Sequence, residues 1–307
     1  MDKRKIILDT DPGIDDAVAI TVLLKACGER VKLIYTTYGN SSLDNSTNNA
    51  LSLVSLLGAD IPVVRGADKP APGNGVYEDA THVHGGDGLG GLQSGLLRDL
   101  LRGAAIEGDH AKIVYDAIAE EGGADYITLG PLTNLAGLLR RYPDVKRLIN
   151  RVVTMGGGIA SGNVTPHAEF NIYCDAESAD YVFSVMPDLA LVPLDVTTRA
   201  AFGLPAINAI GAAGTPVAAA MAAALKVNYD LCSAFGENGS VMHDATAVLA
   251  YLYPEKFVTN TCGMRVECGA ERYGKCLPVE GGAGIKLVTG FDPVWTLDTI
   301  ADSIVNY

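Results

Sequence analysis

Four aspartates lie within eight residues near the start of the chain, in the stretch Asp9-Thr10-Asp11-Pro12-Gly13-Ile14-Asp15-Asp16. Carboxylates this close repel one another and raise one another's pKa unless a cation lies between them. Helix capping and a favourable helix dipole would account for one or two acids at such a place, but not for four. Carboxylate oxygens are the ligands that calcium and magnesium prefer, so the cluster predicts a divalent-metal site.

The segments on either side of this cluster predict how it is positioned. Residues 5–8 form a short apolar run that predicts a buried strand, and Ile14–Cys27 carries apolar residues at helical spacing. The Pro12-Gly13 pair makes the turn between them. Ligands of open α/β sheets bind beyond the carboxyl ends of the strands, so the aspartates lie where such a fold places its site.

The first 200 residues alternate between strand-like and helix-like segments, which favours a mainly parallel sheet flanked by helices. The further expected strands are 31–38, 61–64, 126–129, 151–155 and 189–193, and the further expected helices are 44–58 (capped by Asp44), 107–121, 132–140 and 176–185. An alanine-rich helix at 213–234 follows, then a helix from Asp244, strands after Lys256 and a last helix near Asp298. Because no repeat or linker interrupts the chain, we expect one α/β domain over residues 1–307.

Composition excludes several classes of protein. A hydrophobic fraction of 48% excludes a disordered chain. Lys plus Arg is 23 and Asp plus Glu is 36, and the formal net charge of −13 argues against a nucleic-acid partner. The apolar run at the start is too short for a signal peptide and no segment predicts a membrane span, so we expect a cytoplasmic protein.

Six cysteines without C-x-x-C spacing do not predict a structural zinc site. We interpret them as mostly buried thiols of a reducing compartment. A metal site made by Cys262, Cys268 and Cys276 stays open as a less favoured alternative.

The stretch from Asp9 to Ala17 resembles the N-terminal motif of the inosine–uridine-preferring nucleoside hydrolase family. Other segments resemble that family in the same order, and together they span about residues 5 to 250, whereas the last 50 residues are not diagnostic. These segments are Gly39-Asn40, Val83-His84-Gly85, Leu129-Gly130-Pro131-Leu132-Thr133-Asn134, Met155-Gly156-Gly157 with Asn163, Ala168-Glu169-Phe170-Asn171, and His243-Asp244.

The resemblance implies a single Rossmann-like α/β domain. It implies hydrolysis of the N-glycosidic bond of ribonucleosides, in nucleoside salvage, by a homodimer or homotetramer. It implies one calcium ion bound by Asp11, Asp16, Asp244 and the backbone carbonyl of Leu129, with Asp11 also acting as general base. Asp9 would hold the other aspartates in place. The implied ribose contacts are Asp15, Asn40, Asn163, Glu169 and Asn171; the implied base contacts are His84, Phe170, Tyr229 and His243, of which His243 would protonate the leaving base.

The implied roles agree with the chemistry of the reaction. Positive charge builds on the sugar in an oxocarbenium-like transition state, which a carboxylate-rich site stabilises. Glu169 and Asn171 would lie on one side of the chain if residues 169–171 are extended. Two glycine-containing segments, 70–95 and 236–239, flank the implied base contacts, and we expect them to close over substrate.

Structural interpretations of the same residues stay open. Asn40 and Asn163 follow glycines and are good turn residues, and Tyr229 is equally typical of an amphipathic surface. His84 and its neighbour His82 could simply be exposed loop residues.

Two other functions compete with the hydrolase. A haloacid-dehalogenase-type phosphatase also places Asp-x-Asp after its first strand, but Gly13 stands where that class has Thr or Val. A non-catalytic nucleoside- or calcium-binding protein could keep the same fold. Purine-specific relatives place tryptophan around the base, whereas this chain has its one tryptophan at Trp295 and offers His243 instead. We therefore expect a broad or pyrimidine-leaning preference.

Overall fold

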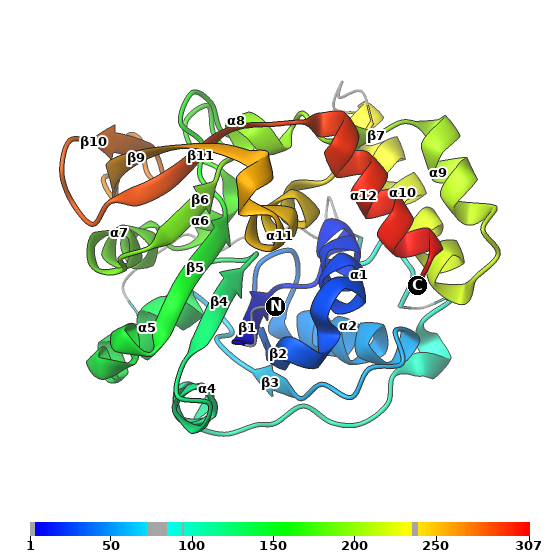
Figure 1. Cartoon of the computed structure of the whole chain (residues 1–307), viewed down its shortest axis with the longest axis horizontal. Coiled ribbons are helices and arrows are strands. Elements are labelled where there is room, and N and C mark those ends of the chain that lie inside the picture. Colours follow the sequence, from blue (N-terminus) through cyan, green and yellow to red (C-terminus); the bar gives the residue numbers. More distant parts are fainter. Residues whose placement is uncertain (1–3, 73–84, 94, 235–238) are drawn as a thin grey trace.

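A nine-stranded sheet runs through the molecule in the order β10-β9-β11-β6-β5-β4-β1-β2-β3 (Figure 1). The computed structural model describes residues 4–72, 85–93, 95–234 and 239–307. Neighbouring strands pair in parallel along the part of the sheet made by β3, β2, β1, β4, β5, β6 and β11. At the other edge, β9 is antiparallel to β11 and β10 is antiparallel to β9. The mainly parallel α/β class expected from the sequence is thus confirmed. The bounds are β1 (Lys5–Thr10), β2 (Val31–Thr36), β3 (Val63–Arg65), β4 (Ala124–Thr128), β5 (Ile149–Met155), β6 (Leu189–Val192), β9 (Phe257–Val266), β10 (Cys276–Val279) and β11 (Ile285–Phe291).

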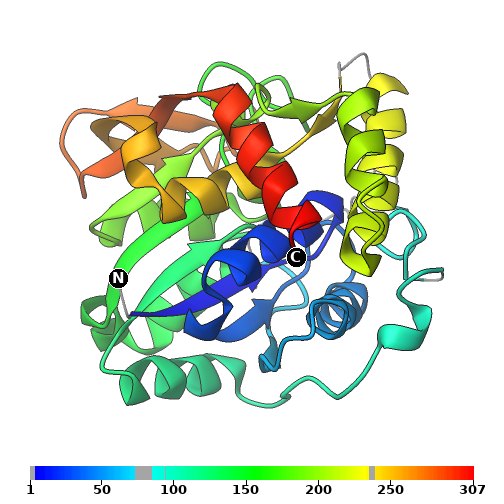
Figure 2. The same ribbon diagram turned by 45° about the vertical axis from the view of Figure 1, so that its right-hand side comes forward.

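Helices cover both faces of the sheet because successive strand residues point to opposite sides. On β1, Ile6 and Leu8 join the core cluster of one face and Ile7 joins that of the other. Figures 1 and 2 show the two helical layers. The first face packs against α1 (Ile14–Cys27), α2 (Leu43–Leu56), α9 (Leu204–Gly211), α10 (Pro216–Ala234), α11 (His243–Leu252) and α12 (Pro293–Val305), and the second against α4 (His110–Glu120), α5 (Thr133–Arg141) and α7 (Ala176–Val185).

Most predicted elements are present, with shifted ends. The predicted bounds of α1 and α7 are confirmed, and β1 extends two residues further than expected, to Thr10. The prediction of a helix from residue 213 was wrong at its start, because α9 ends at Gly211 and α10 begins only at Pro216.

Asp44 is not the N-cap of α2. Ser42 holds that position in an extended conformation, and its side chain accepts a hydrogen bond from the Asn45 backbone N–H at 3.3 Å. Asp44 is exposed in the first turn and forms an ion pair with Arg65. The helix therefore begins one residue before Asp44, because Ser42 has the extended backbone and the side-chain acceptor that an N-cap requires.

Several short elements were not expected from the sequence. They are α6 (Phe170–Cys174), α8 (Leu194–Thr197), the antiparallel pair β7 (Ala201–Phe202) and β8 (Ser240–Val241), and the 3₁₀ turns η1 (Gly28–Arg30), η2 (Arg98–Leu100), η3 (Pro143–Arg147) and η4 (Pro254–Lys256). The β7–β8 pair matters for the site, because it brings the end of α8 beside the start of α11.

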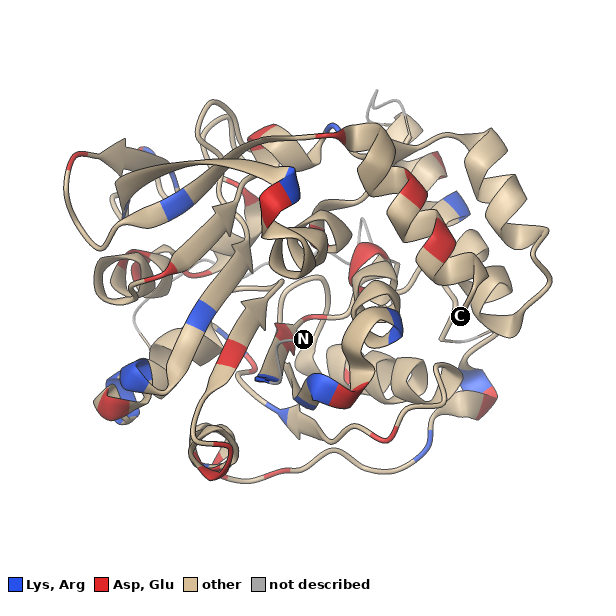
Figure 3. Ribbon diagram, viewed as in Figure 1, with Lys and Arg blue, Asp and Glu red and all other residues tan. Residues whose placement is uncertain are grey.

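Acidic and basic residues are interspersed along the described elements (Figure 3). No helix within the described ranges is both long and apolar enough to cross a membrane.

Candidate metal and nucleoside site

Three buried carboxylates meet where the first turns of α1 and α11 converge. Asp15, Asp16 and Asp244 each place a carboxylate oxygen within 4.8 Å of the others. The backbone N–H of Asp244 also donates to Asp15 Oδ2 at 3.3 Å, so the two helix starts are joined directly. The partial positive charge at both helix N-termini offsets some of the repulsion. In the part of the chain that the structure describes, these three aspartates are the metal-ligating side chains that lie close enough together to hold an ion.

Asp11 lies beside this group on the turn that follows β1, and it is completely buried. Its Oδ2 accepts a hydrogen bond from the Asn40 backbone N–H at 2.7 Å. Its Oδ1 has no hydrogen-bond partner among the described residues. Two glycines enclose the carboxylate: a Cβ on Gly130 would lie 2.5 Å from Oδ1, and one on Gly39 would lie 1.9 Å from Oδ2. The chain therefore fixes one oxygen of Asp11 and leaves the other for a ligand.

Asn40 ties Asp11 to Asp16. Its side-chain amide donates to Asp16 Oδ2 at 2.9 Å and to the Asp11 backbone carbonyl at 3.2 Å. Asp16 is held further by the Thr10 hydroxyl and by the Gly13 backbone N–H, which lies 3.0 Å from Oδ2. Asn40 is therefore more than a turn residue after β2, because it orients two of the clustered acids.

Burial raises the pKa of every carboxyl in the cluster. For Asp16 the loss of solvent, reinforced by the charge of Asp15, raises the pKa to about 6. Desolvation and the Asp16 charge hold the pKa of Asp11 well above its usual range, and desolvation and the Asp15 charge do the same for Asp244. Desolvation also raises the pKa of Asp15. The described part of the chain thus gathers negative charge without placing a cationic side chain in the cluster.

The donor set fits a hard divalent cation. It offers carboxylate oxygens, and the orphaned Oδ1 of Asp11 is a buried acceptor that a cation would satisfy. The Leu129 carbonyl lies at the same end of the sheet and accepts a hydrogen bond from the Asn171 side chain at 2.6 Å. A carbonyl oxygen has a second lone pair, so this bond does not remove Leu129 from the candidate ligands.

Glu169 and Asn171 lie at the start of α6, and both are buried. Glu169 caps the helix: its Oε1 accepts from the Asn171 N–H at 3.0 Å and its Oε2 accepts from the Gly157 N–H at 2.7 Å. The premise of an extended chain at residues 169–171 was wrong, because Phe170–Cys174 is helical. Both side chains nevertheless lie beside Gly156, where an added Cβ would be 3.3 Å from Glu169 Oε2 and 3.5 Å from Asn171 Cβ.

The remaining expected contacts are Asn163, Phe170, Tyr229, His84 and His243. Asn163 is exposed, and its side-chain oxygen accepts from the backbone N–H of the half-buried Phe170 at 3.0 Å. Tyr229 is half-buried on α10. His84 and its neighbour His82 lie outside the described residues. His243 begins α11, is half-buried, and lies with Nδ1 2.7 Å from the Thr197 hydroxyl.

Asp9 points away from the cluster to the opposite face of the sheet. It is completely buried and accepts hydrogen bonds from the Tyr126 hydroxyl at 2.6 Å and the Asn134 amide at 2.9 Å. Burial raises its pKa to about 7, although both bonds lower it. Asn134 also donates to the Thr36 carbonyl and accepts from the Ala67 N–H. The Asp9–Asn134 pair therefore fastens the ends of β1 and β2 to the chain that follows β3.

Three positioning side chains were missed by reasoning from the sequence. Asn134 stood inside a family-like motif, so that motif was a usable signal. Asn49 donates to the Pro12 carbonyl at 3.0 Å and to the Asp87 carbonyl at 2.9 Å, which joins the aspartate turn to the loop at 85–93. Thr197 is 46 residues from His243, and no local pattern predicts their contact.

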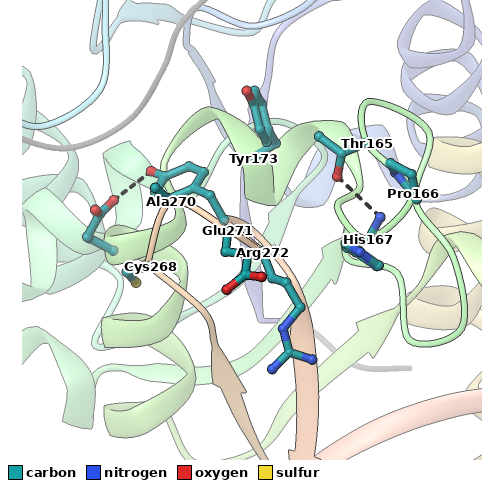
Figure 4. A pocket seen from close by; sticks show the side chains of 10 residues that line it. Thr165, Pro166, His167, Tyr173, Cys268, Ala270, Glu271 and Arg272 are labelled. Atoms are coloured by element: carbon teal, nitrogen blue, oxygen red, sulfur yellow. Dashed lines mark hydrogen bonds between the residues drawn. The ribbon is translucent and has the colours of Figure 1, made fainter.

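An open hollow of about 590 Å³ lies outside this cluster, between the loop at Thr165–His167 and the residues near Arg272 (Figure 4). Its lining includes Tyr173 and Tyr273, whose rings meet edge to face. None of the clustered aspartates lines it, so we do not assign the chemistry to this hollow.

Comparison with known proteins agrees with this geometry. The family model described as inosine-uridine preferring nucleoside hydrolase matches residues 6–294. A non-specific ribonucleoside hydrolase RihC of Klebsiella pneumoniae (strain 342) is 38% identical over 276 residues, covering 85% of this chain and 83% of that protein. The RihC of Salmonella schwarzengrund (strain CVM19633) is 36% identical over 268 residues, with coverage of 85% and 83%.

Solved structures resemble the chain over its whole length. A plant nucleoside hydrolase matches with a TM-score of 0.93 at 27% identity, covering 100% of both chains. A purine-preferring ribonucleoside hydrolase from Gardnerella vaginalis shares the fold with a TM-score of 0.89 at 24% identity, covering 99% of this chain and 98% of that one. The chain therefore belongs to the inosine–uridine preferring nucleoside hydrolase family, and it is an enzyme that hydrolyses ribonucleosides.

Proposed function

We propose that this enzyme uses calcium to hydrolyse the N-glycosidic bond of ribonucleosides, with a broad or pyrimidine-leaning preference for the base, in nucleoside salvage. The observation that carries the proposal is the buried group of four aspartates, in which Asp11 keeps one oxygen without a hydrogen-bond partner among the described residues. Such a group is costly in a folded chain unless a cation completes it.

Asp11, Asp16, Asp244 and the Leu129 carbonyl would hold the ion. Asp15 lies within the same group, and we assign its carboxylate to the ribose hydroxyls beside the ion. A mixed set of carboxylates, a carbonyl and substrate hydroxyls suits calcium better than the stricter octahedron of magnesium. When bound, the ion would balance the carboxylates and make a nearby water more acidic.

Asp11 is the proposed general base. Oδ2 is occupied by the Asn40 N–H, so Oδ1 is the oxygen that would accept a proton from the attacking water. Gly39 and Gly130 would keep the carboxylate from rotating away, since both pack against its oxygens.

The ribose would be gripped by Asp15, Asn40, Asn163, Glu169 and Asn171. Buried acids near the sugar stabilise the positive charge that builds as the glycosidic bond breaks. Besides the bond from Asn171, Glu169 accepts backbone hydrogen bonds from Ile172 in α6 and from Gly157 after β5, which would hold its carboxylate rigid beside the sugar. The exposed Asn163 would act through Phe170, whose backbone N–H it binds.

His243 is proposed to protonate the leaving base, with His84, Phe170 and Tyr229 lining the base pocket. Its neighbour Asp244 belongs to the carboxylate group, so a base attached to the bound ribose would lie close to the imidazole. Trp295 agrees with the absence of tryptophan stacking on the base, because its half-buried ring packs edge-on against Tyr253 and Phe257 instead. The RihC relatives are named non-specific ribonucleoside hydrolases, which agrees with a broad preference for the base.

The decisive experiment measures kcat/KM for uridine, cytidine, inosine, adenosine and guanosine on metal-free enzyme and after addition of calcium or magnesium. We expect activity only with the metal, higher with calcium, and a spread among the five ratios that favours uridine. Full activity in the presence of a chelator would refute the metal role, and binding without release of ribose would identify a non-catalytic protein.

Three further expectations remain proposals. A homodimer or homotetramer can be checked by light scattering. A cytoplasmic location can be checked by cell fractionation. The segments at 70–95 and 236–239 are expected to close over substrate, and a nucleoside analogue should then protect both from proteolysis.

A further inference from the structure

The imidazole of His243 is held from behind by a residue on a different element. Thr197 is completely buried at the end of α8. Its hydroxyl lies 2.7 Å from His243 Nδ1 and 3.4 Å from the Leu194 backbone carbonyl. The carbonyl can only accept, so when the hydroxyl donates its proton to Leu194, its oxygen accepts from the imidazole Nδ1–H.

This arrangement selects one tautomer of the ring. An oxygen that accepts from Nδ1 keeps the Nδ1 proton in place. The proton that passes to a leaving base then has to come from Nε2. Rotation of the ring would break the bond to Thr197, and a shift of its proton to Nε2 would require the hydroxyl to give up its bond to Leu194 in order to donate to Nδ1. The hydroxyl therefore fixes both the direction of the imidazole and the nitrogen that carries the exchangeable proton.

The backbone around this contact keeps the two residues in register. β7 and β8 pair Ala201 with Val241, and the Met242 N–H donates to the Ala200 carbonyl at 2.8 Å. These bonds join residues 200–201, which follow Thr197, to residues 241–242, which precede His243. The α8 end is thus attached to the start of α11 by more than the side-chain bond alone.

We propose that Thr197 is a positioning residue for departure of the base: it holds His243 so that Nε2 delivers the proton. The proposal rests on the proposed function of His243 as the group that protonates the leaving base. A residue of this kind acts through the imidazole, so its loss should matter only where the leaving group needs a proton.

The test compares natural nucleosides with p-nitrophenyl β-D-ribofuranoside, because nitrophenolate is a stable anion that leaves without protonation. Thr197→Val should lower kcat for uridine and inosine by about 10- to 100-fold, since misplaced proton donors lose most of their effect. Its KM for uridine and its kcat for the nitrophenyl riboside should each stay within a factor of about three, because binding and an unprotonated departure do not need the imidazole proton. Thr197→Ser, which keeps the hydroxyl, should restore most of the uridine rate.

Thr198 provides the matched control. It is exposed, and its hydroxyl bonds the same Leu194 carbonyl at 3.1 Å without a recorded contact to His243. Thr198→Val should therefore leave both substrates unaffected. Equal losses on both substrates in Thr197→Val, no loss on either, or no rescue by serine would each overturn the proposal.

His243→Ala separates this inference from the function on which it rests. A selective loss on uridine in His243→Ala but not in Thr197→Val would refute the role of Thr197 and keep that of His243. No selective loss in His243→Ala would refute both. If both roles hold, the double variant should be no slower on uridine than His243→Ala alone, because Thr197 acts through the ring.

Discussion

Each end of the sheet buries an aspartate, but the charges around the two carboxylates have opposite signs. At the amino end of β4, Asp125 is completely buried and accepts a 2.8 Å hydrogen bond from the Tyr251 hydroxyl. Three arginines surround it, with Arg4, Arg30 and Arg151 nitrogens 3.5, 3.9 and 3.8 Å from its carboxylate. At the carboxyl end of β1, Asp11 and its three neighbours face one another instead.

The difference separates stability from function. Around Asp125 the chain supplies its own positive charge, and Arg151 also stacks on the Tyr251 ring at 4.2 Å. Around Asp11 the described residues supply none, so the balance is left to a ligand. The amino end joins the strands together, and we propose that the carboxyl end is built at a cost that a bound cation and substrate offset.

The largest expected effect is on turnover at the carboxyl end. Asp11→Asn keeps the size of the side chain and removes the base, so kcat for uridine should fall by about 10³-fold. The melting temperature of the metal-free variant should not decrease, because one repelling charge is gone. Steady-state kinetics and calorimetry check both points, and near-normal kcat would remove Asp11 as the base.

A second effect at the same end tests the enclosure of Asp11. Gly130→Ala would place a Cβ 2.5 Å from Asp11 Oδ1, so the carboxylate has to move. We expect a fall in kcat of about 10- to 100-fold, because small displacements of a reacting group are costly. Gly137→Ala on α5 is the control, since its added Cβ meets open space. Equal kcat in the two variants would show that the position of Asp11 is not critical.

The same substitution should have opposite effects on stability at the two ends. Asp125→Asn leaves three arginines around a neutral group, and we expect the free energy of unfolding to fall by about 2–3 kcal/mol. Asp244→Asn in the metal-free enzyme removes a repelling charge and should leave stability unchanged or increase it. Urea unfolding of both variants checks the signs. If both variants lose stability equally, the two ends do not differ as described.

The smallest expected effect is the pH dependence of the metal-free enzyme. The pKa of Asp16 is about 6 in the folded state against 3.8 as its ordinary value, so between these values the folded state binds more protons than the unfolded state. Stability should therefore fall as pH rises through this window, by about 2–4 °C in melting temperature for each kcal/mol lost. Saturating calcium should remove the decline at pH 7.5. A metal-free melting temperature that rises from pH 4 to pH 6 would contradict the raised pKa.

How far the sequence predicted this architecture depends on the range of the contacts involved. The strand at residues 5–8 and the helix Ile14–Cys27 follow from local apolar periodicity, and the turn with its aspartates follows from Pro12-Gly13. The meeting of Asp15 with Asp244 joins residues 229 positions apart, and family resemblance rather than any local pattern pointed to it.

The elements and contacts that the sequence did not predict also depend on residues far apart in the chain. The short elements α6 and α8 are each one turn or little more, and tertiary contacts rather than periodicity hold them. The role of Asp9 could not be read locally either, because Tyr126 and Asn134 reach it from β4 and α5 across the opposite face. The contact between Thr197 and His243 depends on the β7–β8 pair, whose two-residue strands carry no sequence signal.

The central claim is that the carboxylates at the end of β1 bind the cation that hydrolysis requires. Calorimetric titration of metal-free enzyme with calcium, run beside uridine hydrolysis at the same calcium concentrations, tests it directly. We expect one strong site per chain, activity that rises with its occupancy, and loss of both in Asp244→Asn but not in Asp125→Asn. Calcium binding that survives Asp244→Asn, or full hydrolysis with the site empty, would contradict it.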